Sequence, residues 1–182
     1  MKRCKWPEND VLMTKYHDEE WGRPVYDDFK LFECLTLEAA QAGLSWKTIL
    51  YKRENYKKAF DKFNYNAVSK YDEQKVEELM NNKGVVRNRL KINATINNAQ
   101  QIINIRTEFK TFSNYIWGFT DNKIINNKFD FEKEIPSKSN LSDLITKDLK
   151  NRGFKFVGTT IIYAFLQAIG VINDHLNQCD FK

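Results

Sequence analysis

Hydrophobic residues recur every three to four positions along most of the chain, which is the spacing of a helix that buries one face. Asp27, Ser45 and Asp72 stand just before three of these runs and Ser113 before a fourth, where their side chains can cap a first helical turn. The pattern therefore predicts helices over 28–42, 46–60, 73–80, 90–105, 142–152 and 159–169, with a further short helix around Ile116 and Trp117.

The segments between these helices are short, apart from a polar stretch over 121–140 that contains Pro136 and is predicted to be a connecting loop. The chain has only 7 Gly and 3 Pro, whereas a sandwich of short strands needs many turns. At 182 residues it can bury a substantial core without disulfides. We therefore expect one all-α domain over 1–182, with its N-terminal and C-terminal segments packed together.

Composition excludes two broad classes of protein. The chain is 42% hydrophobic and 14% aromatic, which is too apolar for an intrinsically disordered protein. It contains no apolar run approaching the roughly 18 residues that a membrane-spanning helix needs. Met1 is followed by basic residues without an apolar signal segment, so we expect a cytoplasmic protein without disulfides.

The basic residues are grouped, and the formal net charge is +5. Such groups suit a surface that faces phosphates, although each one taken alone is also typical of a solvated helix face. The three groups are Lys47, Lys52, Arg53, Lys57 and Lys58, then Lys83, Arg87, Arg89 and Lys91, and finally Lys147, Lys150, Arg152 and Lys155.

Potential metal ligands stand at the two ends of the chain. Cys4 and His17 lie near the N-terminus, and His175 and Cys179 are four residues apart near the C-terminus. Two Cys and two His can form a closed tetrahedral zinc site that leaves no position for catalysis, so such a metal would be structural. The alternative is a pair of surface histidines with two unrelated thiols. Cys34 follows the apolar stripe of its helix and is interpreted as a core residue.

Glu38 occupies an apolar stripe where a core helix normally carries a hydrophobic side chain. Trp6, Tyr16, Trp21 and Trp46 surround it in the sequence. Aromatic rings with one carboxylate can form a pocket for a flat, cationic ring, which they bind by stacking and cation–π attraction. The alternatives are a structurally satisfied acid and an ordinary aromatic core.

A glycine-bounded turn joins the last two predicted helices, from Gly153 to Gly158 with Lys155 between them. Glycines let backbone N–H groups point outward at a helix N-terminus, where the helix dipole favours an anion. The form is that of a helix-hairpin-helix motif at about 142–169, which binds a DNA backbone. The alternative is a simple turn between two helices.

Several motifs together resemble the 3-methyladenine DNA glycosylase I family of bacteria, within the helix-hairpin-helix glycosylase superfamily. The resemblance spans almost the whole chain and implies a two-lobed helical fold with a cleft. The matching stretches are Cys4–Trp6, Tyr16–Gly22, Leu37–Trp46, Lys52–Tyr56, Arg152–Thr160 and Asn173–His175. Met13 departs from the pattern, because some members carry a pocket Tyr there, and 121–140 matches least.

The resemblance also implies an activity, namely flipping 3-methyladenine out of alkylated double-stranded DNA and hydrolysing its glycosidic bond to leave an abasic site and the free base. Relatives that also cut the strand place a Lys at the start of the hairpin's second helix, where this chain has Thr159 and Thr160. A monofunctional, monomeric hydrolase is therefore expected.

The resemblance assigns the site residues as follows. Glu38 and Tyr16 act on the base, and Trp46, Trp6 and Trp21 complete its pocket. Gln41, Gly43 and Leu44 probe the gap left in DNA, while Gly153, Lys155 and Gly158 contact its backbone. One structural Zn²⁺ is held by Cys4, His17, His175 and Cys179. Two other hypotheses remain, a catalytically silent DNA-binding protein and a hydrolase of free nucleobases or nucleosides.

Overall fold

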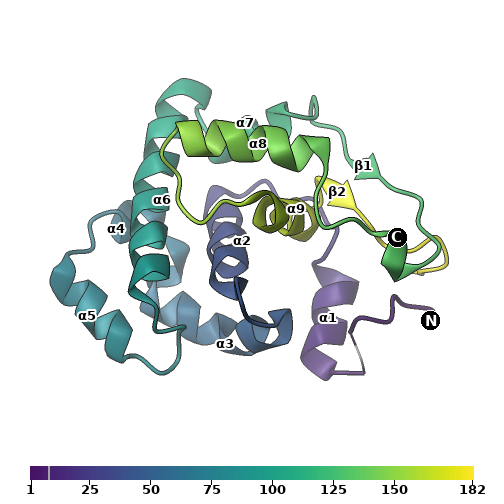
Figure 1. Ribbon diagram of the computed structural model, residues 1–182, viewed down its shortest axis with the longest axis horizontal. Helices are drawn as coiled ribbons and strands as arrows, with labels where there is room; N and C mark the ends of the chain where they lie inside the picture. Colours follow the sequence, from purple (N-terminus) through teal and green to yellow (C-terminus); the bar gives the residue numbers. More distant parts are fainter. Residues whose placement is uncertain (8) are drawn as a thin grey trace.

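Helices dominate the computed structural model, which describes residues 1–7 and 9–182 (Figure 1). The short strands β1 and β2 form one parallel pair. No helix in this described part of the chain is long and apolar enough to span a bilayer. The elements are α1 Val11–Glu19, α2 Asp28–Gln41, α3 Trp46–Ala59, η1 Asp61–Phe63, α4 Tyr65–Val68, α5 Glu73–Asn81, α6 Arg89–Phe109, α7 Phe112–Gly118, β1 Ile125–Asn126, η2 Glu132–Glu134, α8 Asn140–Asn151, α9 Thr159–Ala168 and β2 Ile172–Asn173.

Three of the four expected helix caps are confirmed. The side chains of Asp27, Ser45 and Asp72 each accept a hydrogen bond from the backbone N–H three residues later. The expectation for Ser113 is wrong, because Thr111 caps α7 and the Ser113 N–H instead donates to Asp28 at 2.8 Å. The predicted helix over 142–152 also begins earlier, at Asn140, because Ser139 and Ser142 form a reciprocal capping box.

The prediction of a mostly helical chain is confirmed. The hydrophobic pattern does not predict α1, which carries Tyr16 and His17, the short α4 or the two parallel strands. Within the polar 121–140 stretch, the Ile125 N–H donates to the Val171 carbonyl and the Asn127 N–H donates to the Asn173 carbonyl. Strands of two residues have no measurable hydrophobic period, so the sequence pattern could not reveal them. The pairing attaches the stretch to the C-terminal segment.

Helix α2 lies at the centre of the molecule and contacts α3, α6, α7 and α9 (Figure 1). A large hydrophobic cluster surrounds it, and a smaller one lies around Cys4, Met13, Tyr16 and Trp21. The two ends of the chain meet beside this smaller cluster, where the Asp180 N–H donates to the Lys2 carbonyl at 3.0 Å. The expected packing of the terminal segments against each other is therefore confirmed.

Candidate functional site

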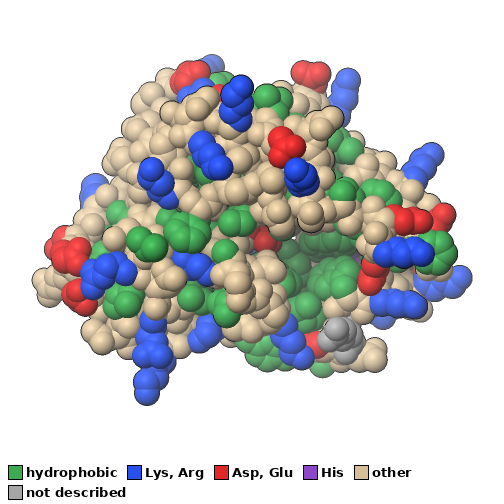
Figure 2. Space-filling view, in the orientation of Figure 1, with side chains coloured by type: hydrophobic (Ala, Val, Ile, Leu, Met, Phe, Trp, Pro, Cys, Tyr) green, Lys and Arg blue, Asp and Glu red, His purple; other side chains and the backbone are tan. Residues whose placement is uncertain are grey.

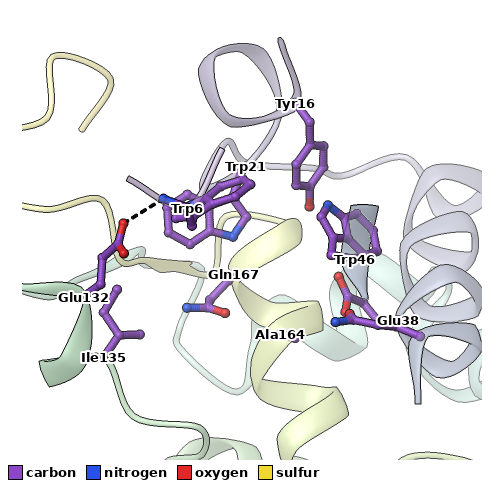
Figure 3. A pocket seen from close by; sticks show the side chains of 10 residues that line it. Trp6, Tyr16, Trp21, Glu38, Trp46, Glu132, Ile135, Ala164 and Gln167 are labelled. Atoms are coloured by element: carbon purple, nitrogen blue, oxygen red, sulfur yellow. Dashed lines mark hydrogen bonds between the residues drawn. The ribbon is translucent and has the colours of Figure 1, made fainter. Parts of the chain in front are cut away.

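A cavity of about 350 Å³ opens between the N-terminal segment, α1, the end of α2 and α9. Figure 2 shows this hollow to the right of centre, with hydrophobic side chains on its walls. The structure brings all five expected pocket residues to it from the N-terminal segment, α1 and the turn after it, α2 and α3 (Figure 3). The lining residues are Trp6, Tyr16, Trp21, Glu38, Gln41, Trp46, Glu132, Ile135, Ala164 and Gln167.

Glu38 is the most unusual group in the cavity. Its side chain is only 5% exposed, and no described residue makes a hydrogen bond or ion pair with its carboxylate. Burial away from water raises the pKa of Glu38 to about 8, so the free acid is mostly protonated at neutral pH. A cation in the cavity would favour the carboxylate form. The group therefore has an unused capacity to bind a positively charged ligand.

The aromatic residues form the walls of the cavity. The Trp6 ring lies edge-on to Trp21 with 5.3 Å between centroids, and Tyr16 is tilted against Trp46 at 5.1 Å. The buried indole N–H groups of Trp6 and Trp46 have no hydrogen-bond partner among the described residues. Buried polar groups are normally paired, so the unpaired ones here indicate a cavity built for a ligand. Its aromatic walls suit a flat ring.

Glu132 and Ile135 were not expected in the site, because they belong to the polar 121–140 stretch. One carboxylate oxygen of Glu132 accepts the backbone N–H groups of Lys5 and Trp6 at 2.5 and 2.9 Å (Figure 3). These bonds hold the Trp6 segment over the cavity. Glu132 lies in a charged stretch whose sequence is typical of a solvent-exposed loop, so no local sequence pattern identified it as a site residue.

Arg53 was expected on a phosphate-facing surface, but the structure places it in a partly buried ion network. Its guanidinium donates two 2.7 Å bonds to Glu20 and one 2.5 Å bond to Glu33. These contacts join the end of α1 to α2 and α3 beneath Tyr16 and Trp46. Burial opposes the ionisation of Glu20, but the cationic side chains of Arg53 and Lys30 lower its pKa to about 2.

Two further arginines of the basic groups are also engaged. Arg89 forms ion pairs with Glu73 and Glu77, and Arg152 with Asp148 and Glu108. An arginine whose guanidinium is already paired with carboxylates is poorly suited to a phosphate. The expectation that whole basic groups face phosphate is therefore wrong for these three side chains.

The four terminal metal-ligand candidates meet in one buried cluster. One ligand atom from each of Cys4, His17, His175 and Cys179 lies within 4.8 Å of all the others. Cys179 Sγ is 3.6 Å from His17 Nε2 and 3.3 Å from His175 Nδ1. Cys34 lies elsewhere, packed against the large core as expected. The alternative of unrelated surface thiols and histidines does not fit this arrangement.

The outward-facing nitrogens of both histidines are already bonded. His17 Nδ1 lies 2.7 Å from Asp18, and His175 Nε2 lies 3.0 Å from the Trp21 carbonyl oxygen. Each ring is thereby oriented with its other nitrogen toward the two thiols, as metal-binding histidines usually are. Burial lowers the pKa of His175 to about 4, so its imidazole is neutral, which metal binding requires. The cluster could hold a metal ion.

The turn between α8 and α9 has two kinds of backbone N–H. The N–H groups of Gly153 and Phe154 donate to backbone carbonyls of α8, and the N–H of Lys155 donates to the Asn98 side chain at 2.8 Å. By contrast, the N–H groups over 156–160 have no acceptor among the described residues. Gly153 has a φ of +87°, which favours glycine. The structure thus leaves the N-terminus of α9 open to an anion and occupies the Gly153 end.

The turn that follows α2 projects into solvent. Gly43 has a φ of +80° and no neighbouring atom within 4 Å of where a Cβ would lie. Leu44, the next residue, is 43% exposed although it is hydrophobic. Gln41 points back to the cavity, so this turn lies at the cavity's rim.

Comparison with known proteins identifies the family. The model of the family described as Methyladenine glycosylase matches residues 6–182. The chain belongs to this family. DNA-3-methyladenine glycosylase 1 of Escherichia coli K12 is 44% identical to this family member over 179 residues, which cover 98% of the chain and 96% of the relative. DNA-3-methyladenine glycosylase of Haemophilus influenzae is 41% identical over 180 residues, covering 99% and 97%.

Solved structures of methyladenine glycosylases also match the fold. One is a variant of 3-methyladenine DNA glycosylase I in complex with 3-methyladenine. It is 34% identical to this chain, with a TM-score of 0.97, and the match covers 100% of this chain and 98% of the other.

Proposed function

We propose that this methyladenine glycosylase excises 3-methyladenine from alkylated double-stranded DNA by hydrolysing the N-glycosyl bond. The observation that carries the proposal is the aromatic cavity with the unpartnered acid Glu38. Near-full-length relatives named for this activity support it. The products are the free base and an abasic site, and the reaction is a step of base-excision repair.

The cavity recognises the charge and the shape of the base. Methylation at N3 makes the adenine attached to DNA a cation, and its flat ring fits between the aromatic side chains. Tyr16 and Trp46 stack on the ring, where the π faces attract its charge. Glu38 accepts a hydrogen bond from the exocyclic amine. Entry of the cation lowers the pKa of Glu38 from about 8, so the acid releases its proton and pairs as a carboxylate.

The chemical step needs little help from an acid, because the positive charge already makes 3-methyladenine a good leaving group. Electrostatic stabilisation by Glu38 maintains the base in its pocket while water attacks the sugar carbon. The start of α9 carries Thr159, whose hydroxyl lies 2.8 Å from that of Ser142, and no lysine that could form a covalent intermediate. We therefore propose a monofunctional hydrolase without a strand-cutting step.

DNA is bound by two surfaces outside the cavity. Extruding a base costs a few kcal/mol of unpairing and unstacking. Leu44, with Gln41 and Gly43 in the same turn, fills the vacated space. The helix-hairpin-helix motif of 142–169 binds the backbone through the open N–H groups at Gly158 and the following residues, with Lys155 and Gly153 in the same turn.

The buried Cys–His cluster holds one structural Zn²⁺. Its two thiols and two inward-facing imidazole nitrogens match the donor set that zinc prefers. Four protein ligands leave no position for substrate, so the ion supplies cross-linking and no catalysis. Cys4 would thereby be tied to the C-terminal segment, and Trp6 two residues later would be held over the cavity.

We further propose that residues 1–182 form a single two-lobed domain that works as a monomer, since one copy of the chain supplies both the aromatic walls of the cavity and its acid. Because its substrate is DNA, we propose that the protein acts in the bacterial cytoplasm, at the nucleoid.

The test is incubation of the purified protein with methylated duplex DNA, followed by chromatography of the released bases. Free 3-methyladenine, with abasic sites but no strand cuts in the DNA, is the expected result. A protein that binds the duplex and releases no base would be a silent DNA-binding protein. Release of bases only from free nucleosides would show a small-molecule hydrolase.

A further inference from the structure

We propose that Gln167 reads the edge of the base with its carbonyl oxygen, and that the buried Asp174 sets this orientation. The proposal rests on the glycosylase function above and extends it to the choice between methylated purines. Figure 3 shows Gln167 at α9 and Glu38 at α2 on different sides of the same cavity.

Asp174 is a fully buried acid whose hydrogen bonds are all to neutral groups. Tyr163 OH and Gln167 Nε2 donate to one of its oxygens at 2.6 and 2.8 Å, and Asn127 Nδ2 donates to the other at 2.7 Å. Its exposed fraction is 0%. Such a carboxylate is held rigidly, because losing any donor would leave a buried charge less well satisfied.

This arrangement determines which end of the Gln167 amide faces the cavity. An ionised carboxylate can only accept hydrogen bonds, so the amide nitrogen must face Asp174 and the carbonyl oxygen must lie on the other side. Gln167 lines the cavity, whereas Asp174 is buried and is not among the lining residues. The cavity therefore presents a neutral acceptor at Gln167 in addition to the acid at Glu38.

Two acceptors on different helices suit a base with an exocyclic amine. An exocyclic amine has two N–H bonds, and we place that of 3-methyladenine where one donates to Glu38 and the other to Gln167. 3-Methylguanine carries a carbonyl oxygen at the corresponding ring position, which would face acceptors and leave them unpaired. A site built for a hydrogen-bond donor rejects a ligand that lacks the donor. Gln167 is thus a specificity-determining residue, and Asp174 is its positioning residue.

The decisive variant is Gln167→Met, which keeps the length of the side chain and removes the acceptor. The matched control is Tyr163→Phe, which removes a different donor from the same oxygen of Asp174 and leaves Gln167 in place. Asp174→Asn tests the positioning role, because a neutral amide can donate or accept and no longer dictates the orientation of Gln167.

Excision rates on DNA containing 3-methyladenine or 3-methylguanine, and binding of the free bases by tryptophan fluorescence, are measured for each protein. We expect Gln167→Met to lower the rate ratio of 3-methyladenine to 3-methylguanine by about five- to tenfold and to weaken binding of free 3-methyladenine similarly. Asp174→Asn should lower the ratio less. Tyr163→Phe should lower the thermal midpoint and leave the ratio unchanged.

An unchanged ratio in Gln167→Met, or equal changes in Gln167→Met and Tyr163→Phe, would overturn the proposal. Wild-type excision reports separately on the glycosylase function. If the wild-type protein released no base, the function would fail, and the binding comparison of free 3-methyladenine between wild type and Gln167→Met would still decide the role of Gln167.

Discussion

The aromatic cavity and the Cys–His cluster both bring together polar groups that a ligand could satisfy, but these groups are arranged differently. In the cluster, four ligand atoms converge within 4.8 Å, while the outward nitrogens of both histidines are bonded. In the cavity, Glu38 and the indole N–H groups of Trp6 and Trp46 stand apart around a space of about 350 Å³.

This difference in arrangement indicates which kind of ligand each site suits. Converging donors around a small centre are satisfied by one ion, which replaces many weak contacts with a rigid cross-link. Separated groups around an open slot are satisfied only by an extended ligand with its own polar edge. With an ion bound, the first arrangement would stabilise the fold, whereas the second would cost stability until its ligand enters.

Breaking the cluster should have the largest effect. Cys179→Ala removes one ligand and leaves three buried polar groups unsatisfied. We expect a loss of about 4 kcal/mol or more in the free energy of unfolding, with excision lost only to the extent that folding is lost. Elemental analysis and thermal unfolding, with and without a chelator, measure this. Cys34→Ala is the matched control and should keep one zinc per chain. An equally stable, metal-free wild-type protein would contradict the zinc proposal.

Glu38→Gln should move activity and stability in opposite directions. The amide keeps the shape of the acid and removes the cost of burying it, so the thermal midpoint should stay the same or rise. Excision should fall because a charge-assisted contact with the base, worth about 1.5–3 kcal/mol, is lost. Residual activity is expected, since the charged base already leaves readily. Unchanged excision with a lowered midpoint would show a structural acid.

The pH dependence of stability sharpens the same point. The pKa of Glu38 is about 8 in the folded protein and 4.5 when exposed, so the folded state binds the proton more tightly. The contribution of the protonated Glu38 to the free energy of unfolding is fully present below pH 4.5 and is lost as pH rises through 8. The free energy of unfolding falls over this range by at most about 1.4 kcal/mol per pH unit. Glu38→Gln should therefore gain stability relative to wild type as pH rises over this range. Denaturant unfolding of both proteins from pH 5 to 9 measures this. A difference in unfolding free energy that stays constant over this range would contradict the raised pKa of Glu38.

A smaller effect is expected at the turn between α8 and α9, where the backbone N–H groups over 156–160 have no acceptor among the described residues. Gly158→Asp places a good N-cap at α9, so folding should be unchanged or improved. The added charge should repel phosphate and weaken binding to all duplexes by roughly tenfold, or about 1.4 kcal/mol, regardless of sequence. Gly158→Ser is the neutral control. Normal duplex binding by Gly158→Asp in a filter or anisotropy assay would show that the turn does not contact DNA.

The residues that sequence reasoning missed share one property, which is that their partners are distant in the chain. Glu132 bonds to Lys5 and Trp6 more than 120 residues away, and Asp174 orients Gln167 only because β2 returns beside α9. Likewise, the local sequence placed Arg53 in a basic group that suits phosphate. In the folded protein its guanidinium instead bonds to Glu20 and Glu33, which are 33 and 20 residues away. A local pattern contains no information about such encounters.

The sequence by itself determined most of the helices, though not α1 or α4, together with the caps at Asp27, Ser45 and Asp72 and the acid on an apolar stripe. Each of these features depends on residues within one or two turns. It also marked two Cys and two His near the two ends as candidate metal ligands. Only the tertiary structure decided that these ends meet, which cations remain available to a ligand, and which way Gln167 faces. Those outcomes depend on burial and on contacts between distant segments, where desolvation makes each unpaired group costly and thereby selects one arrangement.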